Sequence, residues 1–145
     1  MTTIPVTTQQ REELVDITHA VQDAVRASGC RNGVCHVCCA HTTAGLTINE
    51  NADPDVVQDL LLSLTDIVKN LRGFRHGEGN STAHVKSTLA GAHTAVPVHD
   101  GRLVLGTWQA VYFCEFDGPR RRHVQVVCTP EAASIAAHAC ADETR

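Results

Sequence analysis

Short stretches of alternating apolar and polar residues occur towards both ends of the chain, and this alternation predicts β-strands. Asp-Gly pairs, which are typical of tight turns, follow two of these stretches, at Asp100 and at Asp117. We expect strands over residues 3–8, 12–18, 33–40, 44–49, 94–98, 103–116 and 123–128.

Apolar residues at helical spacing and helix caps predict three helices. The first covers residues 19–28 and stops at Gly29. Asp53 and Pro54 are a good N-cap and first residue for the second, whose apolar stripe ends at Ile67. The third begins at residue 80 or 81 and ends by 89. Strands at both ends with helices between them indicate one α+β domain over residues 1–145, not a doubly wound parallel sheet.

The stretch 103–116 holds the only Trp and the only Tyr of the chain. At a period of two, Gln109 and Glu115 project from one face of the expected strand, while Trp108 lies on the other. This pattern favours two interpretations about equally: a polar site built on a rigid strand, and an edge strand with one solvated face.

Composition and charge exclude some classes of protein. Apolar residues make up 43% of the chain and charged residues 19%, and the net charge is −4, which argues against nucleic acid as a partner. Three consecutive arginines from Arg120 to Arg122 suit a compact anionic ligand better. Neither a membrane-spanning segment nor a signal peptide is seen in the sequence, so we expect a cytoplasmic protein without a membrane partner. Its seven cysteines should then be mostly free thiols.

Three histidines lie on different expected elements: His41 before a strand, His76 in a loop and His84 in the first turn of a helix. Three imidazoles with an open position are a common zinc site, although their spacing here is not diagnostic and each can equally be an ordinary polar residue. The run that starts at His41 closes with Asn49 and Glu50, which supply donors and acceptors. It can also be read as a Thr-rich strand that ends in a polar turn.

The start of the third helix offers groups that bind phosphate. Backbone N–H groups of residues 81–83 and the side chains of Lys86 and Ser87 can receive such an anion. The glycine-rich lysine motif of nucleotide hydrolases is absent.

Together these residues resemble the YjbQ family, also described as uncharacterised protein family 0047 or the secondary thiamine-phosphate synthase type. The resemblance runs over almost the whole chain. It rests on His41-Thr-Thr-Ala-Gly-Leu-Thr-Ile-Asn-Glu-Asn-Ala-Asp-Pro, on Ala83-His84-Val-Lys-Ser with Gly91, on Val96-Pro97-Val98 with Gly101, and on Gly106-Thr-Trp-Gln with Glu115.

The resemblance implies a subunit built on a β-sandwich with helices, and a homotrimer whose sheets pack around the threefold axis. It also implies a divalent metal, zinc first and magnesium where a diphosphate binds. The expected metal ligands are His41, His76 and His84. The expected catalytic residues are Glu115, Gln109, Arg120 and Glu50, and the expected substrate-binding residues are Asn49, Lys86, Trp108 and Arg122.

The activity implied by the resemblance is a thiamine-phosphate synthase reaction, which joins a pyrimidine methyl diphosphate to a thiazole phosphate and releases pyrophosphate. We therefore expect a metal-associated enzyme that acts on a small phosphorylated heterocycle. Two alternatives stay open. One is a non-catalytic trimer that binds a metal or a phosphorylated ligand, and the other is a metal-assisted hydrolase of a different anionic substrate.

Overall fold

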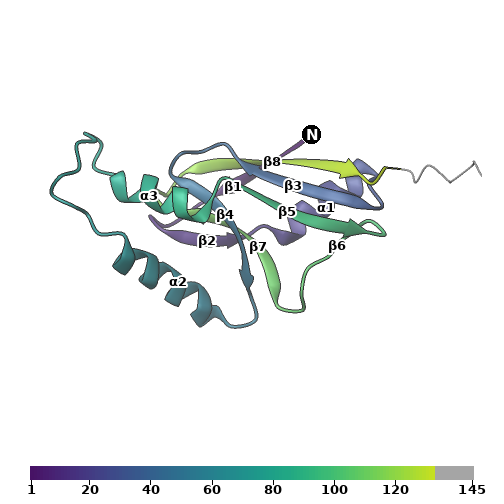
Figure 1. Cartoon of the computed structure of the whole chain (residues 1–145), viewed down its shortest axis with the longest axis horizontal. Helices are drawn as coiled ribbons and strands as arrows, with labels where there is room; N and C mark the ends of the chain where they lie inside the picture. The colour runs from purple at the N-terminus through teal and green to yellow at the C-terminus, as the bar shows by residue number, and fades with distance from the viewer. Residues whose placement is uncertain (133–145) are drawn as a thin grey trace, which may run out of the picture.

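The structure is a computed structural model and describes residues 1–132. Within this range the strands form two antiparallel sheets (Figure 1). The larger sheet has the order β1 (Thr2–Thr7), β8 (Arg121–Pro130), β3 (Gly33–Cys39), β5 (His93–His99) and β6 (Arg102–Leu103). The smaller has the order β2 (Glu13–Asp16), β7 (Gln109–Glu115) and β4 (Ala44–Glu50). This mixed fold with curled antiparallel sheets agrees with the predicted α+β class.

The main core lies where the inward faces of the two sheets meet the helix α1 (Thr18–Ser28). Strict alternation along the strands brings these faces together: Cys35, Val37 and Cys39 of β3 are buried, while the residues between them are only half-buried. Gly29 ends α1 in the left-handed conformation that glycine adopts without strain (φ 71°). The largest core side chains include Phe113, Leu46, Val21, Val25, Val37, Val111 and Val124.

The opposite face of the smaller sheet is covered by α2 (Pro54–Ile67) and α3 (Ser81–Ala90). Asp53 caps α2 as predicted, since its side chain accepts the N–H of Asp55 at 2.9 Å. The apolar stripe of α2 is nevertheless only partly covered. No residue of this helix is buried, and the side chain of Ile67 is 71% exposed. A cavity of about 190 Å³ lies beside α2 and α3, lined mainly by Leu14, Leu60, Leu64, Leu89, Cys114 and Phe116.

The expectation of one long strand over residues 103–116 is wrong. A turn interrupts it, in which Gln109 N–H donates to the carbonyl of Gly106 (2.9 Å) and Gly106 N–H donates to Gln109 Oε1 (2.8 Å). The strand β7 begins only at Gln109, and Trp108 lies in the turn with its side chain 64% exposed. Since β7 is the central strand of its sheet, the interpretation as an edge strand is also wrong.

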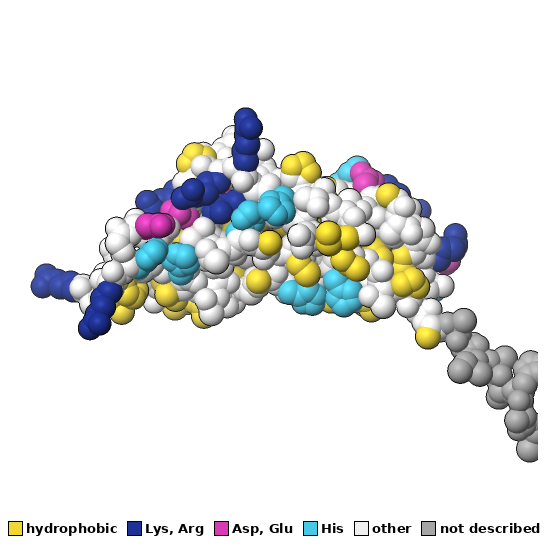
Figure 2. All heavy atoms as spheres, turned by 90° about the horizontal axis from the view of Figure 1, so that it is seen from above, with side chains coloured by type: hydrophobic (Ala, Val, Ile, Leu, Met, Phe, Trp, Pro, Cys, Tyr) yellow, Lys and Arg dark blue, Asp and Glu magenta, His cyan; other side chains and the backbone are white. Residues whose placement is uncertain are grey.

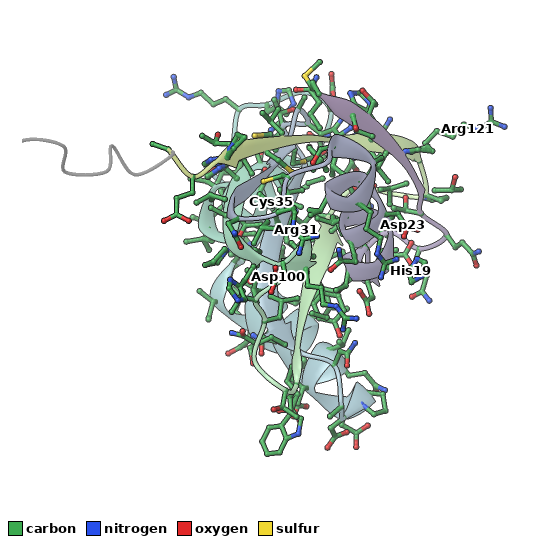
Figure 3. All side chains as sticks on the ribbon, turned by 90° about the vertical axis from the view of Figure 1, so that its right-hand side faces the viewer. His19, Asp23, Arg31, Cys35, Asp100 and Arg121 are labelled. Carbon is green, nitrogen blue, oxygen red and sulfur yellow. The ribbon has the colours of Figure 1, made fainter. Side chains whose placement is uncertain are left out.

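Neither the cysteines nor the exposed ion pairs add a cross-link or a strong interaction to the described part of the fold. The six cysteines within residues 1–132 are free thiols, and burial raises the pKa of Cys114 to about 12, so this thiol is not reactive. Cys140 lies outside the described residues. Exposed ion pairs such as Arg31 with Asp100 (2.7 Å; Figure 3) are screened by water and add little stability.

None of the helices described is long and apolar enough to cross a membrane.

A close approach between β4 and α3 gives a test of this packing. A Cβ atom added to Gly45 would lie 2.8 Å from the Cβ of Ala90 and 2.8 Å from the carbonyl oxygen of Gly91. We expect Gly45→Ala to lower the free energy of unfolding by about 1–3 kcal/mol through this overpacking, measured by urea denaturation. Gly77→Ala is the control, because a Cβ there meets nothing within 4 Å. Equal stability of the two variants would contradict the packing described.

Candidate functional site

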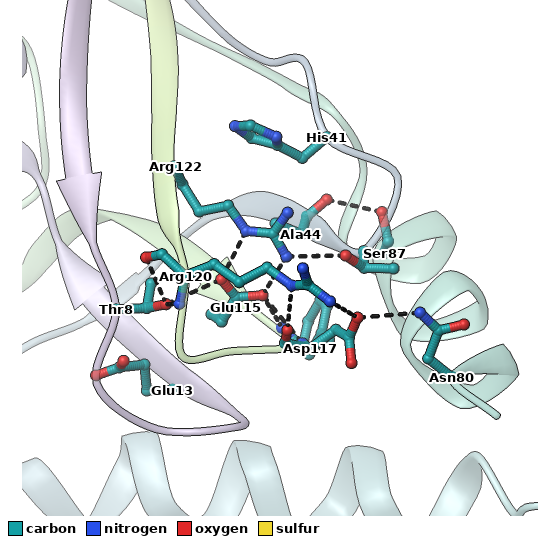
Figure 4. Close-up of polar contacts among 12 residues, drawn as sticks. Thr8, Glu13, His41, Ala44, Asn80, Ser87, Glu115, Asp117, Arg120 and Arg122 are labelled. Atoms are coloured by element: carbon teal, nitrogen blue, oxygen red, sulfur yellow. Dashed lines mark hydrogen bonds and ion pairs between the residues drawn. The ribbon is translucent and has the colours of Figure 1, made fainter. Parts of the chain in front are cut away.

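A buried ion pair lies at the end of β7. The Glu115 side chain has no solvent exposure, and Arg122 of β8 binds both of its oxygens, with Nη2 2.7 Å from Oε1 and Nε 2.8 Å from Oε2 (Figure 4). The hydroxyl of Thr8 donates to Oε2 at 3.0 Å, and the backbone N–H groups of Phe116 and Asp117 donate to Oε1 at 3.1 and 3.0 Å. The carboxylate is therefore saturated with donors from its own chain.

The electrostatics of this pair keep both groups charged. Burial by itself would raise the pKa of Glu115, but the hydrogen bonds from Arg122 and from the backbone of Asp117 outweigh it, so the pKa lies below its ordinary value. The hydrogen bond to Glu115 raises the pKa of Arg122 in turn. Glu115 is thus ionised at neutral pH. The pair is not a surface ion pair, because the side chain of Arg122 is only 9% exposed. This geometry fits a positioning residue better than a proton acceptor.

A second carboxylate connects this pair to α3. Asp117 Oδ2 accepts from Arg120 Nη2 at 2.8 Å and from Asn80 Nδ2 at 3.0 Å (Figure 4). Arg120 is about half exposed, so its guanidinium remains accessible to a ligand. Asn80 precedes α3 and is buried, and its Oδ1 has no hydrogen-bond partner among the described residues. The start of α3 is therefore held in place by Asp117 and retains one unsatisfied acceptor.

The histidines predicted as metal ligands fall into two places. The rings of His76 and His84 meet edge to face with centroids 5.1 Å apart, and both line an open hollow of about 430 Å³ together with Ser81 and Val85. His41 is elsewhere, beside Arg122 (Figure 4), with its ring 4.7 Å from that of His123.

The environment of His41 disfavours its charged form. Burial, and then the positive charge of Arg122, lower the pKa of His41, and its Nε2 accepts the backbone N–H of His123 at 3.1 Å. In residues 1–132 no group of three or more His, Cys, Asp or Glu side chains is arranged to hold a metal ion. A single subunit thus brings together two of the three predicted ligands.

Other predicted site residues lie at the far end of β7. Gln109 pairs in register with Glu50, six residue steps from Glu115, which is about 20 Å at about 3.3 Å per residue. The exposed Trp108 precedes Gln109, and the Asn49 side chain accepts the N–H of Glu50 at 2.8 Å. The expectation that Gln109 and Glu115 act in one site of one subunit does not fit this separation.

Lys86 does not face a ligand hollow either. Its side chain is 2% exposed, and the ammonium donates to both oxygens of Glu12 at 2.8 and 2.7 Å and to Thr65 Oγ1 at 2.9 Å. The phosphate-binding role expected for this lysine is therefore replaced, in this geometry, by a buried ion pair that connects α3, α2 and the segment before β2.

The sequence did not point to several of the residues that build the site. Asn80 was visible only as a helix cap and Asp117 only as a turn residue, while Glu12 lies 74 positions from Lys86. Partners so distant leave no local pattern in one sequence. The absence of a partner for Asn80 Oδ1 among the described residues is visible only in three dimensions.

The fold and site define a small α+β protein with paired histidines at the start of α3 and a buried ion pair, Glu115–Arg122, whose neighbour Asp117 holds that helix start. The family model described as UPF0047 protein YjbQ-like matches residues 2–131, and the chain belongs to this family, as its motifs indicated. UPF0047 protein YugU of Bacillus subtilis is 49% identical over 121 residues, covering 83% of this chain and 92% of the relative. UPF0047 protein MJ1081 of Methanocaldococcus jannaschii is 47% identical over 121 residues, covering 83% and 88%.

Solved structures show the same fold. An uncharacterised YjbQ/UPF0047 family protein of Clostridium acetobutylicum superposes with a TM-score of 0.86 at 45% identity, covering 89% of this chain and all of the other. A YbjQ-like protein of unknown function from Sulfolobus solfataricus gives a TM-score of 0.84 at 38% identity, covering 90% and 96%.

Removing the negative charge of Glu115 tests its structural role. We expect Glu115→Gln to lower the free energy of unfolding by about 3–5 kcal/mol at neutral pH, since the charge of Arg122 is left buried and unpaired. Because the folded-state pKa of Glu115 is lowered, its contribution is complete above the ordinary carboxyl pKa of about 4.3 and is lost as the pH falls through the lower folded value. Urea denaturation at several pH values measures this.

The control is Asp100→Asn, which neutralises the exposed partner of Arg31 and should leave stability nearly unchanged. Equal, small losses in both variants would show that the Glu115–Arg122 pair does not hold the fold together.

Proposed function

We propose that this protein is a metal-associated enzyme that acts on a phosphorylated heterocycle, with the thiamine-phosphate synthase-type reaction implied by the family resemblance. The observation that carries the proposal is the open hollow in which His76 and His84 face each other at the start of α3. Two neighbouring imidazoles and a helix start suit a divalent cation with a phosphate ligand.

The side chains present fit part of a metal site. His76 and His84 can supply two nitrogen ligands, and phosphate oxygens or a neighbouring subunit would complete the coordination. A divalent cation there would stabilise negative charge on a diphosphate leaving group. His41 is not required in this arrangement, because its nitrogen is engaged with the backbone of His123.

The chain's own groups bind and orient the substrate in this proposal. Arg120 is half exposed and can contact a phosphate, while Asp117 fixes its guanidinium through Nη2. In the reaction the thiazole nitrogen forms a bond to the pyrimidine methylene carbon, and the carbon–oxygen bond breaks with its electron pair leaving on pyrophosphate. This step needs charge stabilisation on the leaving group more than a general base, so the saturation of Glu115 does not oppose it.

Residues at the far end of β7 can join such a site only from another subunit. We propose the homotrimer of β-sandwich subunits that the family resemblance implies, with Trp108, Gln109 and Glu50 facing a neighbouring chain. The support is exposed apolar surface that a single chain leaves uncovered: Trp108 is 64% exposed, and Leu62 and Ile67 of α2 are 69% and 71% exposed.

The second candidate is a non-catalytic trimer that binds a metal or a phosphorylated ligand. The observation in its favour is that two residues expected to act on the substrate are engaged in internal pairs: Glu115 with Arg122, and Lys86 with Glu12. The third alternative, a hydrolase of another anionic substrate, needs a base to activate water; the exposed Glu78, whose Oε2 is 3.8 Å from His76 Nε2, is the candidate for that role.

We expect His84→Ala to remove one metal ion per subunit and to reduce thiamine phosphate formation by about 100-fold or more. His99→Ala, an exposed histidine outside the hollow, should change neither quantity. Metal content is measured on untagged protein by plasma mass spectrometry, and product formation is followed from the two phosphorylated precursors. Because protons compete for imidazole, metal occupancy should fall at low pH. A metal-loaded wild type without turnover would leave the binding-protein alternative in place of the enzyme.

We expect a solution mass three times the chain mass of 15.6 kDa by light scattering. Ile67→Asp should weaken the trimer, because it places a charge on an apolar surface that the fold leaves exposed, whereas Gln58→Asp on the same helix should not. A stable wild-type monomer at micromolar concentration would contradict the trimer.

A further inference from the structure

A second pair of histidines lies outside the site described above, on the outer face of the larger sheet. His36 of β3 points away from the core, since Cys35 and Val37 on either side of it are buried. His93 of β5 does the same, since the buried Val96 lies on the opposite face of that strand. The two rings are stacked with centroids 5.4 Å apart and planes 23° apart. Figure 2, seen from the side of β8 and β3, shows histidines in adjacent groups on the surface.

The register of the strands holds the two histidines together. In the antiparallel pairing of β3 with β5, His36 lies opposite Ala95 and Cys38 lies opposite His93, so the imidazoles are diagonal neighbours on one face. Both strands have further neighbours in the sheet, β8 beside β3 and β6 beside β5. The positions of the two rings are thus set by backbone hydrogen bonding and not by a mobile loop.

The distance between the two ring nitrogens suits chelation. His36 Nδ1 lies 3.2 Å from His93 Nε2. Two imidazole nitrogens at metal–nitrogen distances of about 2.0–2.1 Å and this separation subtend an angle of about 100° at the metal, close to the tetrahedral value. We propose that His36 and His93 together form a two-ligand site for a divalent transition metal that imidazole binds, such as Cu²⁺, Ni²⁺ or Zn²⁺.

The surroundings of the pair permit such an ion. Across β3 the residue opposite His36 is Val127, and Ala95 lies on the other side, so no lysine or arginine faces the pair from the adjoining register positions. In the single chain His93 is exposed, which leaves room for water or a group of a neighbouring subunit as the remaining ligands. Since imidazole sites follow the general affinity order of divalent metals, Cu²⁺ should bind more tightly than Ni²⁺ or Zn²⁺.

The alternative for this geometry is an ordinary hydrogen bond, with one ring nitrogen donating its proton to the other. Chelation differs because it requires both facing nitrogens to be free of protons, so that Nε2 of His36 and Nδ1 of His93 carry the hydrogens. A variant that preserves hydrogen bonding but not chelation separates the two. His93→Gln is such a variant.

The test is titration of the full-length protein with Cu²⁺ and Zn²⁺ by calorimetry, with Cu²⁺ coordination read by electron paramagnetic resonance. We expect His36→Ala, His93→Ala and His93→Gln each to weaken binding at this site by about 100-fold or more, because each removes the advantage of two linked ligands. The copper spectrum should change from two coordinated nitrogens to one or none.

Three controls assign the binding. His99→Ala removes an exposed histidine of the same strand, and Cys38→Ala removes the thiol opposite His93; both should leave this site unchanged. His84→Ala removes a metal ligand of the site proposed in the hollow and should leave the His36–His93 site unchanged, so the two metal sites are tested separately. The proposal is overturned if the variants at positions 36 and 93 bind both metals as the wild type does, or if only Cys38→Ala abolishes binding. Circular dichroism confirms that each variant is folded.

Discussion

The ion pair between Glu115 and Arg122 is the interaction on which the arrangement of this end of the molecule depends. It joins the ends of β7 and β8, and through Thr8 and Thr43 it also holds the end of β1 and the start of β4. A charge in the interior costs several kcal/mol unless a partner and hydrogen bonds compensate it. The four strands therefore have one favourable relative position at this end, and this position also fixes where the adjoining segments lie.

This constraint extends to the histidine hollow in two steps. Asp117, next but one after Glu115, holds Asn80, and Asn80 immediately precedes the helix that carries His84. The pair of Lys86 with Glu12 fixes the same helix at a second point, further along its length. Charged residues that look like candidates for chemistry in the sequence thus position the groups that remain open, and their own charges are already neutralised.

The sequence predicted those parts of the fold that local patterns encode. The N-cap of α2, the stop of α1 at Gly29 and most strands follow from spacing and from residue type, and family membership follows from the motifs. The break of the stretch 103–116 was missed, because the turn at Gly106 is closed by the side chain of Gln109. The buried pairing of Glu115 with Arg122 was not predicted, because the burial of both side chains cannot be read from one sequence.

The predicted site residues fall into two groups because they lie at the two ends of one extended strand. The Gly106-Thr-Trp-Gln segment forms the turn that leads into β7 at Gln109, and Glu115 is the last residue of that strand, so the two parts of the motif lie at opposite ends of β7. A rigid strand cannot bring its two ends to one ligand. If both ends belong to one chemistry, as the shared motif suggests, then the strand must offer each end to a different site, and a second copy of the chain must supply the missing half. The exposed apolar residues of α2, Leu62 and Ile67, and the exposed Trp108 are surfaces that such an assembly would bury. In the trimer proposed above, association of the subunits would bring opposite ends of β7 from two chains to one site.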